Sequence, residues 1–210
     1  MLKSVYSALL RNRFHSLSEQ QTAVSGPLDR VVLIGGDIEL RIVSLVVRCR
    51  EVADNVVLFD TGSTDETVQL AHEVNCQVVQ FSDAITPQKL AEAAVESGCV
   101  DGLTLFLPIS PQWKLSELPL SVNRAREGWD IHYLYRRIGD QGSHDSVVLN
   151  ESVVGHLITS KVGMHQLANL PDGATSDDVS QDVRARFVET DAPIQLPQRQ
   201  SLATASRFAQ

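Results

Sequence analysis

Acidic and hydroxyl side chains crowd the stretch Asp60–Thr67, which reads DTGSTDET. The preceding residues, Val56–Phe59, are all apolar, a pattern typical of a parallel strand that is buried on both faces. A carboxylate just beyond such a strand lies where α/β sheets usually bind ligands, so Asp60 is a candidate binding residue. The alternative is an ordinary strand-turn-helix connection, in which Asp60 accepts a capping hydrogen bond and Ser63 or Thr64 caps the next helix.

Alternating strands and helices must position this stretch. The apolar pattern predicts buried strands over 30–34, 56–59, 77–81 and 102–107, separated by helices over 38–50, a stretch ending near 75, and 86–97. It predicts further helices over 115–127, 158–170 and 179–188 and a strand over 131–137. This order implies an α/β protein with a mostly parallel sheet and helices on both faces.

The stretch Asp60–Thr67 resembles the D-[DTS]-G-S-T-D-x-T signature of family 2 glycosyltransferases, which are inverting enzymes of the GT-A fold. The nearest branch glycosylates lipopolysaccharide cores and related glycans, and the similarity is good over about 30–81. The resemblance implies a GT-A-type (Rossmann-like) sheet, a nucleotide-sugar donor, and a glycan or lipid-linked acceptor. It also implies that the acidic corner at Asp60 and Thr61 contacts the nucleoside of the donor.

Further donor contacts are implied at two places. The family usually carries I-P-x-x-N-E after its first strand, where it cradles the base, and Gly35–Glu39 stands there in this sequence. Gly35, Asp37 and Glu39 are therefore donor-binding candidates, and the glycines allow close backbone approach to a ligand. A basic residue touches the donor phosphates in the family, and Lys89 is the candidate by type, with a solvated lysine as the alternative. Neither a G-x-G-x-x-G loop nor the glycine-rich loop with a basic residue that a nucleotidyltransferase needs is present here.

The family continues L-F-L-D-A-D-[DE] at the fourth strand, where two carboxylates hold a divalent cation (Mn or Mg) against the donor diphosphate. This sequence has Leu105-Phe106-Leu107 followed by Pro108, Ile109 and Ser110 in place of the acids. Proline and isoleucine cannot ligate a metal, and one serine hydroxyl is a poor substitute for two carboxylates. Two functions therefore stay open: a glycosyltransferase, or a catalytically inactive GT-A-like binding or scaffold protein.

On the acceptor side, the resemblance implies an acid that acts as the general base on the acceptor hydroxyl. The candidates are Asp177 and Asp178. The alternative is a capping role for Ser176 or Asp177 at the start of the predicted helix 179–188.

Composition limits the remaining possibilities. The chain has 210 residues and a net charge of −8, which argues against a nucleic-acid partner. Cys49, Cys76 and Cys99 show no metal-binding spacing, so we expect buried free thiols in a reducing compartment, by default the cytoplasm. No apolar run approaches the roughly 18 residues that span a bilayer.

The ends of the chain differ from its centre. Apolar residues recur at helical spacing within Met1–Ser18, with Lys3, Arg11 and Arg13 among them. This predicts an amphipathic helix that contacts a membrane surface, or one that packs on its own domain or on a partner subunit. We therefore divide the chain into an N-terminal helix and linker (1–29), a GT-A-like domain (30–190) and a flexible tail (191–210).

Overall fold

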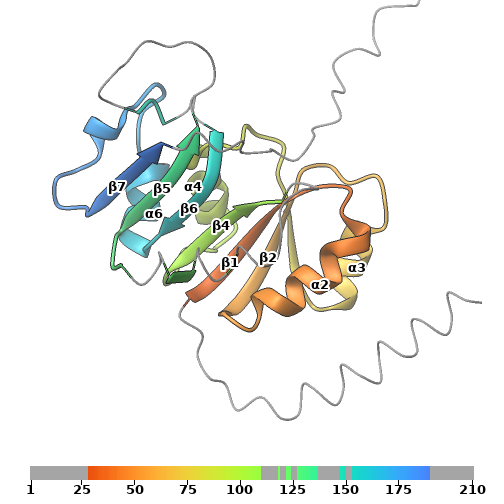
Figure 1. Cartoon of the computed structure of the whole chain (residues 1–210). Coiled ribbons are helices and arrows are strands. Elements are labelled where there is room, and N and C mark those ends of the chain that lie inside the picture. Colours follow the sequence, from red (N-terminus) through yellow and green to blue (C-terminus); the bar gives the residue numbers. More distant parts are fainter. Residues whose placement is uncertain are drawn as a thin grey trace, which may run out of the picture.

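The computed structural model describes residues 28–109, 118, 122–123, 127–136, 147–149 and 153–189 (Figure 1). Within this part a seven-stranded sheet runs in the order β3-β2-β1-β4-β6-β5-β7. Its strands are β1 (Leu28–Gly35), β2 (Ala53–Asp60), β3 (Gln77–Gln80), β4 (Thr104–Pro108), β5 (Ile131–Arg136), β6 (Val153–Thr159) and β7 (Ala185–Glu189). All neighbours pair in parallel except β6, which is antiparallel to both β4 and β5.

Helices cover both faces of the sheet. On one face lie α2 (Glu39–Cys49) and α3 (Thr67–Glu73), and on the other lie α4 (Pro87–Glu96) and α6 (Lys161–Ala168), which pack against each other. The central strands β1, β2 and β4 contain the unbroken apolar runs Val31–Ile34, Val56–Phe59 and Leu105–Leu107, because each of these side chains meets one helix layer or the other. Val32, for example, lies in the core under α4, whereas Leu33 lies in the core under α2.

This arrangement confirms the predicted α/β fold, with a mostly parallel sheet between two helix layers. The predicted helix 179–188 is wrong. The chain forms a one-turn 3-10 helix, η2 (Ser176–Asp178), and then the edge strand β7. Backbone pairing with β5 outweighs local helix preference there.

The predicted helix 158–170 is too long at its start. Strand β6 continues to Thr159, and α6 begins only after Ser160, whose hydroxyl accepts a hydrogen bond from the N–H of Gly163. The predicted N-terminal helix and C-terminal tail lie outside the described residues. None of the helices in the described part of the chain has the length and apolar character that crossing a bilayer requires.

Asp130 joins three elements at the amino edge of β5. Its carboxylate accepts hydrogen bonds from the Ser160 hydroxyl (2.7 Å) and the Arg184 N–H (3.1 Å), while its carbonyl oxygen accepts one from the Ser160 N–H (2.9 Å). Gly163 of α6 packs directly on this junction, and a β-carbon at Gly163 would lie 2.1 Å from the carbonyl oxygen of Asp130. The glycine therefore permits the close approach of α6 to β5.

We expect Gly163→Ala to lower the free energy of unfolding by about 1–3 kcal/mol, because the added methyl group must displace backbone atoms. Chemical denaturation of both proteins measures this loss. The matched control is Val162→Ala, one residue earlier in α6, where the side chain is 58% exposed and the change should stay within about 0.5 kcal/mol. Equal stability of the Gly163→Ala protein and the wild type would contradict this account of α6 packing.

Candidate functional site

The candidate site lies at the carboxyl edge of the sheet, where the loops after β1 and β2 meet. Gly35 and Asp60 end these two strands as direct neighbours in the register. The N–H of Thr61 donates to the carbonyl oxygen of Gly35 at 3.2 Å. The structure thus brings together the predicted donor-binding residues Gly35, Asp60 and Thr61.

Asp60 is used inside its own loop. Its side chain is 2% exposed and accepts hydrogen bonds from the N–H of Gly62 (3.3 Å), the N–H of Ser63 (3.2 Å) and the Ser63 hydroxyl. Gly62 has a φ of 99°, which a side-chain-bearing residue rarely adopts. Asp60 and Gly62 together therefore turn the chain sharply after β2. Asp60 thus has the role of the alternative above, in which its carboxylate accepts hydrogen bonds within the strand-turn-helix connection.

Asp37 ties the first loop to the second. It is exposed and has a φ of 53°, a conformation that aspartate tolerates better than most residues. Its carboxylate accepts from the N–H (2.7 Å) and hydroxyl (3.2 Å) of Thr64 and from the N–H of Asp65 (3.3 Å). Its own N–H donates to the hydroxyl of Ser63 at 3.1 Å. Predicted as a donor contact, Asp37 also fixes the turn that follows β2.

The starts of α2 and α3 cap one another. The N–H of Glu39 donates to the carboxylate of Asp65 at 3.1 Å, and the N–H of Glu66 donates to the carboxylate of Glu39 at 3.2 Å. The hydroxyl of Thr67 accepts from the N–H of Ile38 at 2.8 Å. The expectation that Ser63 or Thr64 caps α3 is wrong. The N–H groups at the start of α2 find their partners on the other loop, and the first N–H of α3, that of Thr67, donates to the carboxylate of Asp65 at 2.9 Å.

Electrostatics at this junction favour charged carboxylates. Burial acts to raise the pKa of Asp65, but hydrogen bonds from Thr67 and from the Glu39 N–H outweigh it and hold the pKa below its ordinary value. Asp65 therefore stays ionised at neutral pH and serves the two helix starts, where negative charge is favoured.

Gly36 makes the close contact of the two loops possible. A β-carbon at this position would lie 3.1 Å from the hydroxyl oxygen of Thr61 and 3.4 Å from that of Ser63. The glycine pair that suggested close approach to a ligand is thus used, at Gly36, for close approach to the neighbouring loop. We name this joined structure, residues 35–39 and 60–67, the loop pair.

The positions expected to hold a metal are apolar in the structure. Pro108 ends β4 beside Ile34, and the N–H of Ile109 donates to the carbonyl oxygen of Ile34 at 2.7 Å. Ile109 is 1% exposed and packs in the core under α2. Ser110 lies outside the described residues. Across the described part of the chain, no group of three histidine, cysteine, aspartate or glutamate side chains is arranged to hold a metal ion.

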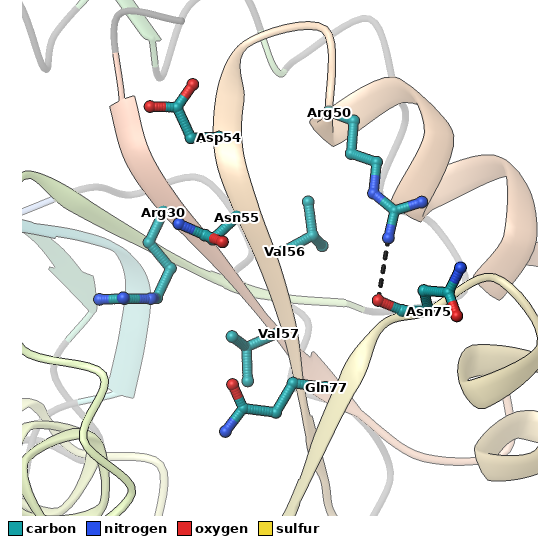
Figure 2. A pocket seen from close by; sticks show the side chains of 8 residues that line it. All are labelled: Arg30, Arg50, Asp54, Asn55, Val56, Val57, Asn75 and Gln77. Atoms are coloured by element: carbon teal, nitrogen blue, oxygen red, sulfur yellow. Dashed lines mark hydrogen bonds between the residues drawn. The ribbon is translucent and has the colours of Figure 1, made fainter. Parts of the chain in front are cut away.

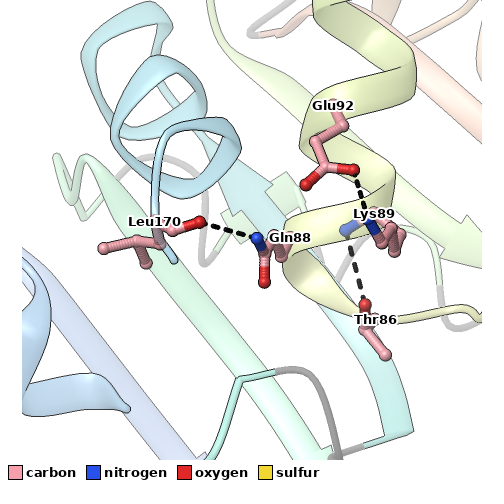
Figure 3. A network of polar contacts seen from close by, with 5 residues as sticks. All are labelled: Thr86, Gln88, Lys89, Glu92 and Leu170. Carbon is pink, nitrogen blue, oxygen red and sulfur yellow. Dashed lines mark hydrogen bonds and ion pairs between the residues drawn. The ribbon is translucent and has the colours of Figure 1, made fainter. Parts of the chain in front are cut away.

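Lys89, the candidate contact for the donor phosphates, lies on α4 and is engaged by neighbours on and before that helix (Figure 3). Its ammonium group pairs with the carboxylate of Glu92 at 2.7 Å, and its N–H donates to the capping hydroxyl of Thr86 at 3.3 Å. The hydrogen bond from Lys89 to Glu92 raises the lysine pKa. Next to it, the side-chain amide of Gln88 donates to the carbonyl oxygen of Leu170 at 2.7 Å, which joins the start of α4 to the segment after α6.

Asp178 caps η2. Its carboxylate accepts from the N–H (2.7 Å) and the hydroxyl (3.0 Å) of Thr175, and the Thr175 hydroxyl in turn accepts from the N–H of Asp177 at 3.3 Å. These hydrogen bonds from Thr175 lower the pKa of Asp178, which weakens it as a base, since a general base works best with a pKa near the working pH. The cap is Thr175 rather than Ser176 or Asp177, and the carboxylate of Asp177 takes no part in this box.

A separate cavity opens at the opposite, amino edge of the sheet. It measures about 150 Å³ and is lined largely by polar residues from the starts of β1, β2 and β3 (Figure 2). Arg30 and Arg50 extend on different sides of β2, and Arg50 donates to the carbonyl oxygen of Asn75 at 3.0 Å. The two guanidinium groups therefore do not converge on one ligand, and the loop pair remains the candidate site.

Residues that sequence reasoning missed are the partners of the predicted ones. Ser63, Thr64 and Asp65 receive or provide most of the hydrogen bonds that join the loops. These residues belong to the signature in the sequence, but the loop that they contact lies some 26 residues away. Only the parallel pairing of β1 and β2 shows that the two loops are neighbours.

No protein-family model matches the sequence, and no curated protein matches it significantly. Several solved structures are similar to this chain over more than half of its length. Glucosyl-3-phosphoglycerate synthase from Mycobacterium tuberculosis, in complex with Mn²⁺, UDP and glucosyl-3-phosphoglycerate, is 20% identical over 76% of this chain and 68% of that chain, with a TM-score of 0.46. Mannosyl-3-phosphoglycerate synthase from Rubrobacter xylanophilus is 14% identical over 56% of this chain and 43% of that chain (TM-score 0.38).

A third solved structure, 4-diphosphocytidyl-2C-methyl-D-erythritol synthase, is 12% identical over 85% of this chain and 95% of that chain, with a TM-score of 0.49. All three TM-scores lie below 0.5.

We expect Asp60→Asn to lower the free energy of unfolding by about 1–3 kcal/mol, because the new amide group would face backbone N–H donors inside a buried turn. Thermal and chemical unfolding measure the loss. Asp182→Asn is the matched control, since this exposed carboxylate lies outside the loop pair, and the change should stay within about 0.5 kcal/mol. A fully stable Asp60→Asn protein would show that the turn does not depend on this carboxylate.

Asp178 should also contribute to the pH dependence of stability. Because its pKa is lowered in the folded protein, its contribution is present above the unfolded value of about 3.9 and is lost as the pH falls through the folded value. We therefore expect the Tm of the wild type to exceed that of the Asp178→Asn protein at pH 6. This difference in Tm should become smaller below about pH 4. In a Thr175→Val background the narrowing should be smaller. A difference that stays constant down to pH 3 would contradict the proposed role of the cap.

Proposed function

We propose that this chain is a glycosyltransferase-like protein whose loop pair binds the nucleoside of a nucleotide-sugar donor without a divalent cation. The observation that carries the proposal is the position of the DTGSTDET turn. It lies at the carboxyl edge of a mostly parallel sheet, locked against the loop after β1, with apolar residues where metal ligands would stand.

Within the loop pair, exposure suggests separate roles for the predicted residues. Asp60 is buried and engaged by its own turn, so we assign it a positioning role. Asp37 is exposed and Thr61 is partly exposed, so these two are the proposed nucleoside contacts. Gly35 and Glu39 support them, Gly35 through its carbonyl oxygen and Glu39 by capping the start of α3.

Charge favours the nucleoside over the diphosphate as the part that is held. The loop pair carries five carboxylates and no basic side chain: Asp37, Glu39, Asp60, Asp65 and Glu66. Because a diphosphate would be repelled by these groups, metal-free binding of the nucleoside alone costs less electrostatic free energy. Lys89 is the proposed counter-charge for a phosphate, although it must first leave Glu92.

The second candidate is a catalytically inactive GT-A-like binding or scaffold protein. Two observations favour it. The buried Ile109 provides no metal ligand at the position where the resemblance places one, and the carboxylate of Asp178, one of the two candidate bases, is engaged in a capping box. For the active alternative, Asp177 is the proposed base, acting on a glycan or lipid-linked acceptor.

We also propose a reducing compartment, the cytoplasm, because Cys49, Cys76 and Cys99 are buried free thiols, as expected. Burial raises the pKa of Cys49 to about 12 and that of Cys76 to about 11, which keeps both unreactive.

Calorimetric titration with UDP, GDP and their sugars, in EDTA and then in Mn²⁺, tests the proposal. We expect binding in EDTA that changes less than about twofold with Mn²⁺. We expect Asp37→Asn to weaken it roughly tenfold, about 1.4 kcal/mol, because asparagine keeps the backbone conformation but replaces one hydrogen-bond-accepting oxygen by a donor. Asp182→Asn is the control and should bind as the wild type does. Binding that requires Mn²⁺ would overturn the metal-free site, and no binding of any nucleotide would favour the scaffold.

A further inference from the structure

The cavity at the amino edge of the sheet has one side that is rich in hydrogen-bond donors (Figure 2). On this side lie Arg30, Asn55 and Gln77, from the starts of β1, β2 and β3, whereas Arg50 lies on the other side of β2. Side chains alternate between the two faces of a strand, so residues two positions apart share a face. The residues two positions further along each strand belong to the core under α4 or pack against it: Val32, Val57 and Val79. The three polar side chains therefore share the α4 face of the sheet, and we call them the amino-edge triplet.

Arg30 supplies the positive charge of the amino-edge triplet. The residue is half-buried, and its guanidinium group donates one hydrogen bond, to the carbonyl oxygen of Asp101 at 3.3 Å, which orients it. The carboxylate of Asp101 is itself paired with the ammonium group of Lys161 at 2.7 Å. Arg30 forms no ion pair with another residue of the described part of the chain. Because a guanidinium group carries several N–H donors in a fixed fork, most of those of Arg30 remain available to a ligand.

The two amides of the amino-edge triplet add further donors. The side chain of Gln77 is exposed and has no hydrogen-bond partner among the described residues. The amide nitrogen of Asn55 donates to the carbonyl oxygen of Asp29 at 3.4 Å, and its second N–H remains available. Val57, which is 2% exposed, lies on the same face and pairs with Gln77 in the register. Asp54 is the carboxylate in the lining, and as the residue before Asn55 it belongs to the opposite face of β2.

We infer that the amino-edge triplet binds a phosphate group, either as the free ion or as part of a phosphomonoester. A guanidinium fork matches the geometry of phosphate oxygens, and amide N–H groups supply the neutral donors that complete such a site. The cavity, at about 150 Å³, has room for a phosphate group. In a chain with a net charge of −8, this side of the cavity carries a positive charge and no carboxylate among its described lining residues. The site lies at the edge of the sheet opposite the loop pair and is therefore independent of the proposed donor site.

Calorimetric titration of the full chain with inorganic phosphate, at constant ionic strength, tests this inference. We expect saturable binding at one site per chain. Gln77→Glu should weaken it at least about tenfold, because a carboxylate of nearly the same shape would repel the phosphate. This variant changes an exposed side chain without a hydrogen-bond partner among the described residues, so it should fold and melt as the wild type does. Asp37→Asn, at the opposite edge of the sheet, should leave phosphate binding unchanged.

Gln80→Glu is the matched control, because it adds the same charge at the other exposed end of β3, outside the cavity. Phosphate binding by this variant should stay within about twofold of the wild type. A second titration, with glycerol 3-phosphate, separates the two sources of the group: tighter binding than that of inorganic phosphate identifies a phosphomonoester, and equal or weaker binding identifies the free ion. The inference would be overturned if phosphate does not bind saturably, or if Gln77→Glu leaves its binding unchanged. Equal weakening by Gln77→Glu and Gln80→Glu would also overturn it, since only the overall charge would then matter.

Discussion

The carboxyl edge of this sheet depends on one requirement: the first backbone N–H groups of α2 and α3 have no partners within their own helices. In most proteins a residue just before the helix supplies the acceptor. Here acceptors also come from the neighbouring loop. Asp65 accepts from the Glu39 N–H of α2 as well as from the Thr67 N–H of its own helix, and Glu39 accepts from the Glu66 N–H just before α3. Asp37 completes the exchange by binding the turn between them. Two helices that are separate in sequence therefore share one set of hydrogen bonds.

This exchange changes what the D-T-G-S-T-D string means. Its polar residues hold the turn itself together, since Asp60 closes it, Ser63 links both loops, and Asp65 caps a helix. The same residues that signal a glycosyltransferase thus also build the architecture that any ligand would meet. Such a turn can stand in a fold whatever the chemistry at a neighbouring strand, and in this chain the buried Ile109 lies where the resemblance would place metal ligands.

The sequence predicted best where physical causes are local or strictly periodic. Unbroken apolar runs identified β1, β2 and β4, because strands covered on both faces need no polar residue. A helix cap at Ser176 or Asp177 was predicted, but the cap is Thr175, and the following segment became β7 because β5 offered backbone partners that no local pattern reveals. The partners of Asp37 and Glu39 were equally hidden, since they depend on which strands become neighbours.

The contact of Gly36 with Thr61 and Ser63 has an evolutionary consequence. With so little space between the loops, a larger residue in one would require a smaller or displaced residue in the other. Among homologues, substitutions at 36–39 should therefore be accompanied by substitutions at 61–66. The two loops would be inherited as a single unit, and a chimaera that exchanges only one of them between relatives would combine surfaces that do not fit.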